Sequence, residues 1–408
     1  MKLAPELFYR DGEFVPNQAV LISDEGLIEG VEDASLHPDA RPMPHRALLP
    51  GLVNAHSHAF QRVFRGATET PGDFWSWRKA MYEAANRFDA DGLYDASKLT
   101  FREMAHSGIT TVGEFHYIHR DRDGRAYSDP NLLALAVVQA ARDVGLRIGL
   151  LRAAYARAGF DKPTDPEQRR FIEPTPEEFL RNAETLRKQL DGQFSWLGVA
   201  PHSIRAVPMD YLRKVAHWAE RERIPLHMHV SEQPAELDAC RAEYGTTPVS
   251  LLAREGILNS RFTAVHAIHI SDEEIRQLAD SGAAVCACPT TERNLGDGIV
   301  AADKLLAAGV PVLLGTDSQA QIDLLEDARE LEYHLRLIHL RRGILDPAEL
   351  FRCATVFGAK CLGAPERGAD FFTVDLLDDT LRGMPINVMT VGKSAVREVI
   401  VGGRFVVG

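Results

Sequence analysis

Two histidines two residues apart, His56 and His58, follow an apolar stretch over residues 48–55. Side chains at positions i and i+2 of a β-strand point to the same side, so both imidazoles can reach one cation. Neutral imidazole suits zinc, iron or nickel, and a divalent ion bound there can acidify a bound water molecule. The pair therefore predicts part of a metal site, whose remaining ligands must come from elsewhere in the chain.

The further ligands that we expect are His229 and Asp317, each of which follows another apolar run. Three imidazoles and the Asp317 carboxylate would leave an open position for water, as a catalytic metal site requires. His227 is the alternative ligand, because it stands two residues before His229 and can face the same way. We favour His229, since it is nearer the end of its strand and only three residues from Glu232.

Two more residues are placed to move protons. Glu232, which is not expected to bind the metal, would carry protons between the bound water and a leaving nitrogen. His266 ends another apolar run and would hydrogen-bond the water and the oxygen that develops at a tetrahedral carbon. With Asp317 they form the predicted catalytic set, which points to metal-assisted hydrolysis.

The elements that must position these residues are short apolar runs that alternate with segments of helical periodicity. Strands are expected over Ala47–Asn54, Thr110–Phe115, Arg147–Ala153, Trp196–Ala200, Pro225–His229, Phe262–His266, Ala284–Cys288 and Val310–Gly315. Helices are expected over Pro208–Glu222, Asp272–Ser281 and Leu325–Leu340, and after a capping box at 175–178. This alternation indicates an α/β protein, a (β/α)8 TIM-type barrel with its active site at the carboxyl ends of the strands. An open doubly wound sheet is the alternative, but no G-x-G-x-x-G follows the first strand.

The two ends of the chain differ from its middle, because they hold short alternating segments separated by turn residues. Neither end has enough apolar surface for a core of its own. We therefore expect residues 1–46 and 366–408 to pair into one small β-domain beside a barrel formed by residues 47–365.

Composition excludes several classes of protein. A net charge of −12 argues against nucleic acid or an anionic membrane surface as the main partner. The five cysteines form no CxxC pair, and Cys286 and Cys288 lie on one face of a predicted buried strand, so we expect reduced thiols. No signal peptide and no run of 18 apolar residues is evident, so we expect a cytoplasmic protein.

In combination, the histidine pair and the polar residues after the fifth, sixth and eighth strands resemble the amidohydrolase superfamily, and within it the mononuclear deaminase branch. Motifs over residues 54–62, 289–298 and 330–337 are similar to those of enzymes that act on N-formimino-L-glutamate. The resemblance implies that water replaces the imine nitrogen of that substrate, giving N-formyl-L-glutamate and ammonia in histidine degradation. It also implies one divalent metal per chain, Zn²⁺ in the first place and Fe²⁺ or Ni²⁺ as alternatives, and a homodimer.

The resemblance further implies which residues bind the two carboxylates of this small anionic substrate. Arg205 and Arg78 would hold them, helped by Tyr117 and His202, while Gln61 would contact the polar end of the substrate. Arginine suits this role because its planar fork binds a carboxylate through two hydrogen bonds.

Two features limit the comparison with relatives. Binuclear barrel hydrolases bridge their ions with a carboxylated lysine at the end of the fourth strand, where this chain reads 199–203 without a lysine, so we expect one metal. Gln319 stands where many relatives carry a small polar residue or asparagine, and would change the pocket's size if it touches substrate.

Two other functions stay open. A deaminase of an aminated heterocycle such as guanine would use the same metal chemistry, although two arginines suit a neutral purine poorly. A non-catalytic scaffold is the alternative from another class, although the complete set of ligands and proton carriers argues against it.

Overall fold

Two sheets organise the structure, a computed structural model that describes residues 1–67, 74–160, 162, 164–366 and 368–408. The larger sheet is parallel, and its eight strands follow chain order: β6 (Leu52–Ser57), β7 (Ile109–His116), β8 (Arg147–Ala154), β9 (Ser195–Pro201), β10 (Leu226–Val230), β11 (Phe262–His266), β12 (Ala284–Ala287) and β13 (Val312–Leu314). A parallel bridge between Ser57 and Asp317 joins the last strand back to the first. The predicted barrel is therefore confirmed.

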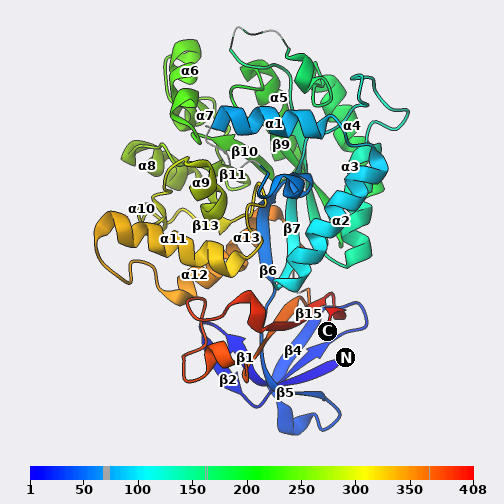
Figure 1. Ribbon diagram of the computed structural model, residues 1–408, viewed down its shortest axis with the longest axis vertical. Coiled ribbons are helices and arrows are strands. Elements are labelled where there is room, and N and C mark those ends of the chain that lie inside the picture. The colour runs from blue at the N-terminus through cyan, green and yellow to red at the C-terminus, as the bar shows by residue number, and fades with distance from the viewer. Residues whose placement is uncertain (68–73, 161, 163, 367) are drawn as a thin grey trace.

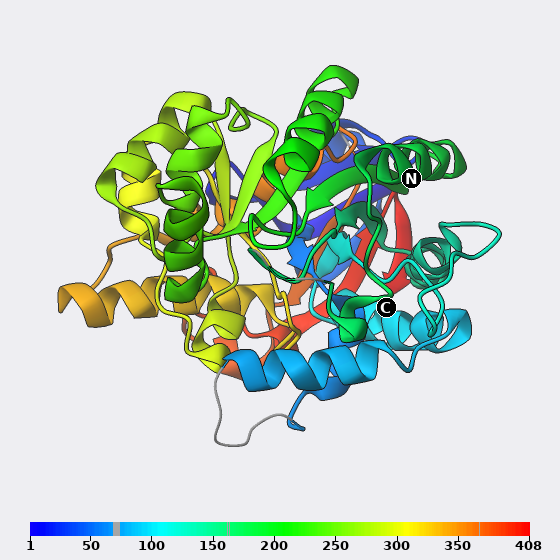
Figure 2. The same ribbon diagram turned by 90° about the horizontal axis from the view of Figure 1, so that it is seen from above.

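Helices surround the barrel, as the view from above shows (Figure 2). They are α1 (Phe74–Ala85), α2 (Ala90–His106), α3 (Leu132–Val144), α4 (Pro176–Gln189), α5 (Met209–Glu222), α6 (Pro234–Tyr244), α7 (Pro248–Arg254), α8 (Asp272–Ser281), α9 (Pro289–Leu295), α10 (Ala302–Ala307), α11 (Leu324–His339), α12 (Pro347–Cys353) and α13 (Val356–Leu362). The helices expected from the sequence are found within one residue of their predicted ends. Among the described helices, none combines the length and the apolar character needed to cross a membrane.

The smaller sheet combines both ends of the chain, as predicted. Its strands are β1 (Lys2–Arg10), β2 (Glu13–Pro16), β3 (Gln18–Ile22), β4 (Ile28–Asp33), β5 (Arg41–Pro50), β14 (Phe371–Asp375), β15 (Val396–Val401) and β16 (Arg404–Val407). β5 lies parallel to β1 and antiparallel to β14, which brings the two termini of the chain together in one sheet (Figure 1). Residues from both ends of the chain, including Leu3, Leu48, Phe371 and Ile400, form a separate small hydrophobic core on this sheet.

One predicted strand is wrong. The apolar run Ala47–Asn54 is divided between β5, which belongs to the terminal sheet, and β6, which begins the barrel. The division falls at Pro50-Gly51, where a Cβ on Gly51 would lie 2.2 Å from Thr110 Oγ1. A continuous apolar run therefore crosses from one sheet to the other, and hydrophobic pattern alone cannot show where. The domain limits at residues 46 and 365 stay a prediction.

The direction of β6 fixes where the strands end. β6 leaves the terminal sheet and the other barrel strands run parallel to it, so their carboxyl ends lie at the far end of the barrel (Figure 1). α1 crosses that end, and the short helix η2 (Ala59–Phe64) follows β6 directly beneath it.

Candidate metal centre and substrate pocket

The first and last barrel strands meet where the predicted metal ligands stand. The backbone N–H of Asp317 donates to the carbonyl of His56 (3.0 Å), and the N–H of His58 donates to the carbonyl of Asp317 (3.0 Å). Gly315 permits this approach, because a Cβ there would lie 2.8 Å from the Cβ of His56. Closing the barrel thus places one histidine strand and one carboxylate strand side by side.

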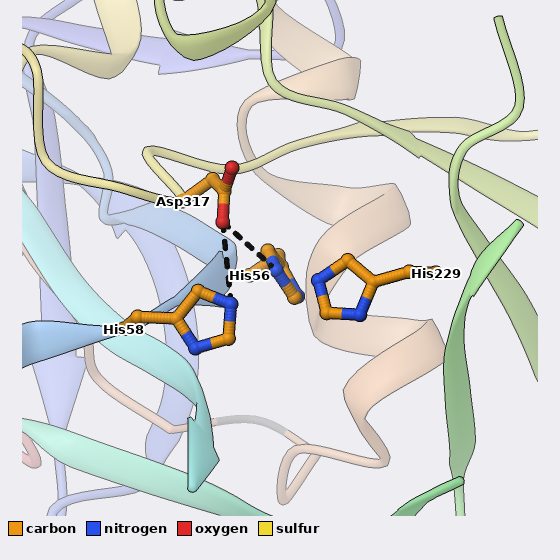
Figure 3. Close-up of side chains that lie close together, drawn as sticks. All are labelled: His56, His58, His229 and Asp317. Carbon is orange, nitrogen blue, oxygen red and sulfur yellow. Dashed lines mark ion pairs between the residues drawn. The ribbon is translucent and has the colours of Figure 1, made fainter. Parts of the chain in front are cut away.

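Four buried side chains converge at this point: His56, His58, His229 and Asp317, whose potential ligand atoms all lie within 4.8 Å of one another (Figure 3). Oδ1 of Asp317 lies 3.2 Å from Nε2 of His56 and 3.3 Å from Nε2 of His58. His229 comes from β10 on the other side of the barrel, and its ring centroid is 4.9 Å from that of His56. These are the four ligands that the sequence predicts, and their proximity is what a shared cation requires.

The remaining ring nitrogens are arranged as in a metal site. Nδ1 of His58 is 2.9 Å from the carbonyl of Phe115, and Nδ1 of His229 is 3.1 Å from the carbonyl of His202. Because each Nδ1–H can donate to a carbonyl, each Nε2 is left with its lone pair for a metal. His56 is fully buried, and its Nε2 faces the Asp317 carboxylate at 3.2 Å. The imidazole and the carboxylate can therefore share one cation.

The protonation states of the four side chains are also those expected of metal ligands. Burial lowers the pKa of His58 to about 3 and holds the pKa values of His56 and His229 below the usual range, so the three imidazoles are neutral. Burial raises the pKa of Asp317, but the contact with His56 and the charge of the nearby protonated His266 outweigh it and lower that pKa overall. Three neutral imidazoles and one carboxylate form a suitable donor set for a divalent cation.

His227, the alternative ligand, lies outside the group of four that the described residues form. Burial lowers its pKa to about 3, which makes it a neutral core histidine.

Backbone strain is concentrated at the same strand ends. Five residues other than glycine have positive φ there: Ser231 (+53°), His266 (+70°), Ala267 (+49°), Asp317 (+43°) and Gln319 (+63°). Such conformations cost of order 1–3 kcal/mol each and persist where the surroundings over-determine them, commonly at functional sites. The sequence gives no sign of this strain.

The predicted proton carriers lie beside the metal-ligand group. Nε2 of His266 is 3.6 Å from Oε1 of Glu232 and 4.0 Å from Oδ2 of Asp317. Burial raises the pKa of the Glu232 carboxyl. Burial lowers the pKa of His266, but the carboxylates around it, Glu232 first, raise that pKa well above its usual value. This side of the centre can therefore hold and release protons.

Glu292 is a member of this site that the sequence analysis missed. Its Oε1 lies 3.1 Å from Nδ1 of His266 and accepts the N–H of Cys288 at 2.8 Å. The contact orients the imidazole so that Nε2 faces Glu232 and Asp317. Glu292 stands inside the motif over 289–298, but its role depends on α9 turning back toward β11, which no local pattern reveals.

A cavity opens from the metal-ligand group, and all five predicted substrate-binding residues line it: Gln61, Arg78, Tyr117, His202 and Arg205. Nε2 of Gln61 donates to Oη of Tyr117 at 2.9 Å, and the buried Oε1 of Gln61 has no partner among the described residues. Nη1 of Arg205 is likewise buried without one. The pocket thus presents a free acceptor and a free cationic donor to whatever enters it.

Three further lining residues come from α1: Trp77, Met81 and Tyr82. Together with Arg78 they lie on one face of that helix, since positions three and four residues apart are neighbours. The Cζ atom of Arg78 stands 5.2 Å from the ring centroid of Tyr82. Helical spacing from Arg78 could have indicated Tyr82, whereas Leu295, which also lines the pocket, carried no such signal.

The expectation for Gln319 changes with the structure. Its side chain is completely buried and is absent from the described residues that line the pocket. Nε2 of Gln319 donates instead to Oγ of Ser57 and to the carbonyl of Asp317, both at 2.9 Å. Gln319 therefore acts on the strand ends and not on the size of the pocket.

The five cysteines are free thiols, as predicted. Cys286 and Cys288 are buried in a small cluster inside the barrel. Cys288 also lies with His266 and Glu292 in a second group of possible ligand atoms, but the hydrogen bonds to Glu292 already account for that contact.

Comparisons with known sequences give a consistent family. The sequence profile of the amidohydrolase family matches residues 47–406. Formimidoylglutamate deiminase from Pseudomonas aeruginosa is 35% identical, covering 95% of this chain and 90% of the relative. 5-Methylthioadenosine/S-adenosylhomocysteine deaminase from Pyrococcus abyssi is 30% identical (88% and 82% covered), and 8-oxoguanine deaminase from P. aeruginosa is 31% identical (79% and 71% covered).

Solved structures agree with these matches. An amidohydrolase from Brucella melitensis superposes with a TM-score of 0.88 at 33% identity, over 99% of this chain and 94% of the other. An adenosine deaminase from Xanthomonas campestris with bound zinc has the same fold, with a TM-score of 0.85 at 24% identity over 99% and 92%.

Proposed function

The chain belongs to the amidohydrolase family and is a hydrolase of C–N bonds, and we propose that its substrate is N-formimino-L-glutamate. Water would replace the imine nitrogen, giving N-formyl-L-glutamate and ammonia. The observation that carries the proposal is that Arg78 and Arg205 line the same cavity as the metal-ligand group. This substrate carries two carboxylates, one beside the amidine and one at the far end of its side chain, and so suits a cavity with two arginines near the metal-ligand group.

The charges in the pocket favour a dianion. Burial and repulsion from the neighbouring Arg205 lower the pKa of Arg78. Burial also opposes the charge of Arg205, but Tyr155, Tyr82 and the carboxylates of Glu236 and Glu232 outweigh it and raise the pKa of Arg205. Two carboxylates would relieve that repulsion, and each guanidinium can hold one through parallel hydrogen bonds. A neutral purine would bring no negative charge to the two desolvated cations and would gain little from them.

A divalent metal fits the residues at the base of the cavity. His56, His58, His229 and Asp317 would hold it, since their potential ligand atoms lie within 4.8 Å of one another and the three imidazoles are neutral. When bound, such an ion lowers the pKa of coordinated water and polarises the reacting group. We propose one Zn²⁺ per chain, while the same ligands accept Fe²⁺ or Ni²⁺.

Glu232 is the residue proposed to move the proton. As a carboxylate it accepts a proton from the attacking water while the new C–O bond forms at the formimino carbon. Burial, which raises the pKa of this carboxyl, stabilises the protonated form that results. The carboxylic acid then gives this proton to the imine-derived nitrogen. Glu232 next takes the remaining hydroxyl proton and passes it to the same nitrogen, so that the C=O bond forms, the C–N bond breaks and ammonia leaves.

His266 and Asp317 complete the catalytic set. The surrounding carboxylates keep His266 protonated, so its Nε2–H can donate to the oxygen at the tetrahedral carbon. Asp317, besides its place among the ligands, lies 4.0 Å from that Nε2 and faces the attacking water with its ionised carboxylate.

The remaining pocket residues orient the substrate. Nη1 of Arg205 and Oε1 of Gln61, which have no partner in the described part of the chain, would contact the substrate, and an N–H of the formimino group is a suitable donor for the latter. Tyr117 holds Gln61 through its hydroxyl, and His202 lies with its ring centroid 4.8 Å from that of His229, between the ligand group and Arg205.

Relatives that are named as nucleoside and purine deaminases make a heterocycle the alternative substrate. The test is ammonia release from N-formimino-L-glutamate, N-formimino-L-aspartate and guanine by the same metal-loaded preparation. The proposal expects strong turnover of the glutamate compound, weak turnover of the aspartate compound and none of guanine. Turnover of guanine would leave the fold and the metal site in place and overturn the assignment of the arginines.

The proposal extends to the setting of the enzyme. A formimidoylglutamate deiminase would act in histidine degradation in the cytoplasm, and we propose that it does so as a homodimer. Sedimentation at micromolar concentration checks the last point, since a monomer would contradict it.

A further inference from the structure

A continuous chain of side-chain hydrogen bonds runs beneath the metal-ligand group. Nδ2 of Asn54 donates to Oγ1 of Thr316 (2.7 Å), which donates to Oε1 of Gln319 (2.8 Å). Nε2 of Gln319 donates to Oγ of Ser57 (2.9 Å), which donates to Oε2 of Glu114 (2.6 Å). All five side chains are buried.

The hydrogen bonds all run in one direction. Each hydroxyl accepts once and donates once, and the central amide accepts with its oxygen and donates with its nitrogen. Aligned bonds of this kind polarise and strengthen one another in a medium of low dielectric constant. The second oxygen of Glu114 accepts the N–H of Ala59 at 2.7 Å, which anchors the end of the chain.

This series of hydrogen bonds joins the strand ends that carry three of the four proposed ligands. Ser57 stands between His56 and His58 on β6, and Thr316 precedes Asp317 after β13. Nε2 of Gln319 also donates to the carbonyl of Asp317 at 2.9 Å. Gln319 is therefore the one described side chain that bonds both to the histidine strand through Ser57 and to the backbone of the carboxylate ligand.

The backbone around Gln319 needs such support. Asp317 and Gln319 both have positive φ, a strained conformation for residues with a side chain. Arg65 adds a third contact, since its Nε donates to the carbonyl of Gln319 at 2.7 Å. These contacts hold the turn after β13 in the one shape that aims Asp317 at the histidines.

We propose that Gln319 is a positioning residue for the metal centre, which fixes the distance between the histidine pair and Asp317 through Ser57 and Thr316. The inference rests on the metal-binding part of the proposed function and not on the choice of substrate. Partners that orient ligands commonly contribute 10–100-fold to metal affinity.

The test is Zn²⁺ affinity, measured by competition with a chromophoric chelator. Gln319→Met keeps the length of the side chain and removes its three hydrogen bonds, and should weaken Zn²⁺ binding about 10–100-fold. The matched control is Asn131→Leu, which also removes buried hydrogen bonds, to Arg152 (3.1 Å) and to the carbonyl of Asn182 (2.9 Å), but outside this chain of bonds. The control should bind Zn²⁺ as tightly as the parent protein.

A second pair of variants tests the hydrogen bonds themselves. Ser57→Ala alone should weaken Zn²⁺ binding, and combining it with Gln319→Met should add little, since the two residues share one bond. Thr316→Val preserves side-chain volume and removes the hydrogen bond from Thr316 to Gln319, but it leaves the bond between Gln319 and Ser57 in place. It should show a smaller loss of affinity, and it serves as the test if Gln319→Met does not fold.

The outcomes separate the inference from the proposed function. If the parent protein binds no Zn²⁺, the metal site itself is wrong. If the parent binds Zn²⁺ and both Gln319→Met and Thr316→Val bind it equally well, or if Asn131→Leu loses as much affinity, the positioning role is refuted while the metal site stands.

Discussion

Two arginines in the interior, Arg152 and Arg205, show how differently this barrel uses buried charge. Arg152 is completely buried, and its Nε donates to Asn131 at 3.1 Å while both terminal nitrogens bond to the carboxylate of Glu173. Nη1 of Arg205, in contrast, is buried without a partner among the described residues and faces the cavity next to the metal-ligand group.

The difference indicates which of the two arginines stabilises the fold and which belongs to a binding site. A buried ion pair with all its hydrogen bonds made has nothing left to offer a ligand. A buried guanidinium with an unmade bond gains most when an anion enters. We therefore expect substitutions around Arg152 to change stability and substitutions around Arg205 to change catalysis.

The largest effect is expected at Glu232, on the pocket side of the comparison. Glu232→Gln keeps the shape of the side chain but can neither accept nor return a proton. Turnover should fall by about 10²–10⁴-fold. Ammonia release measures the loss, and Zn²⁺ content and the urea midpoint should remain those of the parent. A variant with near-normal turnover would assign proton transfer to another group.

A substitution at the ion pair of Arg152 and Glu173 should have the opposite effect, lowering stability and not turnover. Arg152→Met leaves Glu173 buried without its counter-ion, and the free energy of unfolding should fall by about 3–5 kcal/mol. Urea denaturation measures the loss, while turnover per folded molecule at low temperature should be retained. If activity falls with no loss of stability, the assignment of Arg152 to the stability of the fold is wrong.

Arg205→Met is the matched change on the pocket side. Losing a buried contact to substrate carboxylate should reduce kcat/KM for N-formimino-L-glutamate by about 10²-fold, mostly through KM. The free energy of unfolding should change much less than in Arg152→Met, because Nη1 of Arg205 has no hydrogen-bond partner among the described residues. Unchanged kinetics would remove Arg205 from the substrate site.

The smallest effect is the response of Glu173 to acid. Burial opposes ionisation, but Arg152 outweighs it and the pKa of Glu173 is lowered to about 2. A depressed pKa in the folded state stabilises the protein above the unfolded-state pKa of about 4.3, and that stabilisation is lost as pH falls toward the folded-state value. Between about pH 5 and pH 3 this group should account for a loss of about 2 kcal/mol. The loss should disappear in Arg152→Met, and a variant with the same acid sensitivity as the parent would show that another carboxylate is responsible.

The sequence predicts the fold well because its signals are local. Each barrel strand is a short apolar run, and the helices carry clear periodicity, so eight strands and their order follow. The exception is Ala47–Asn54, where two sheets share one apolar run and only the close approach of Gly51 to Thr110 sets the division.

The candidate site is predicted in part, for the same reason. His56, His58, His229 and Asp317 each follow an apolar run, so their side chains could be assigned to the ends of strands. Glu292 and Gln319 could not be assigned, because their roles depend on α9 and the turn after β13 folding back onto other strands. Interactions between distant segments are invisible to spacing along the chain.

Arg78 and Tyr82, which both line the pocket from α1, show the same limit of prediction within one helix. The family resemblance implies a role for Arg78 but none for Tyr82, which stands four residues later on the same face of α1. No helix was predicted over residues 74–85, and which of its faces covers the pocket depends on how α1 crosses the mouth of the barrel (Figure 1).

The most direct test of the central claim is ammonia release from N-formimino-L-glutamate by metal-free protein titrated with Zn²⁺. The account predicts no activity without metal, a linear rise to about one Zn²⁺ per chain, and no further rise beyond it. Full activity in the metal-free protein, or a titration that reaches its plateau only at two ions per chain, would contradict a single catalytic metal held by His56, His58, His229 and Asp317.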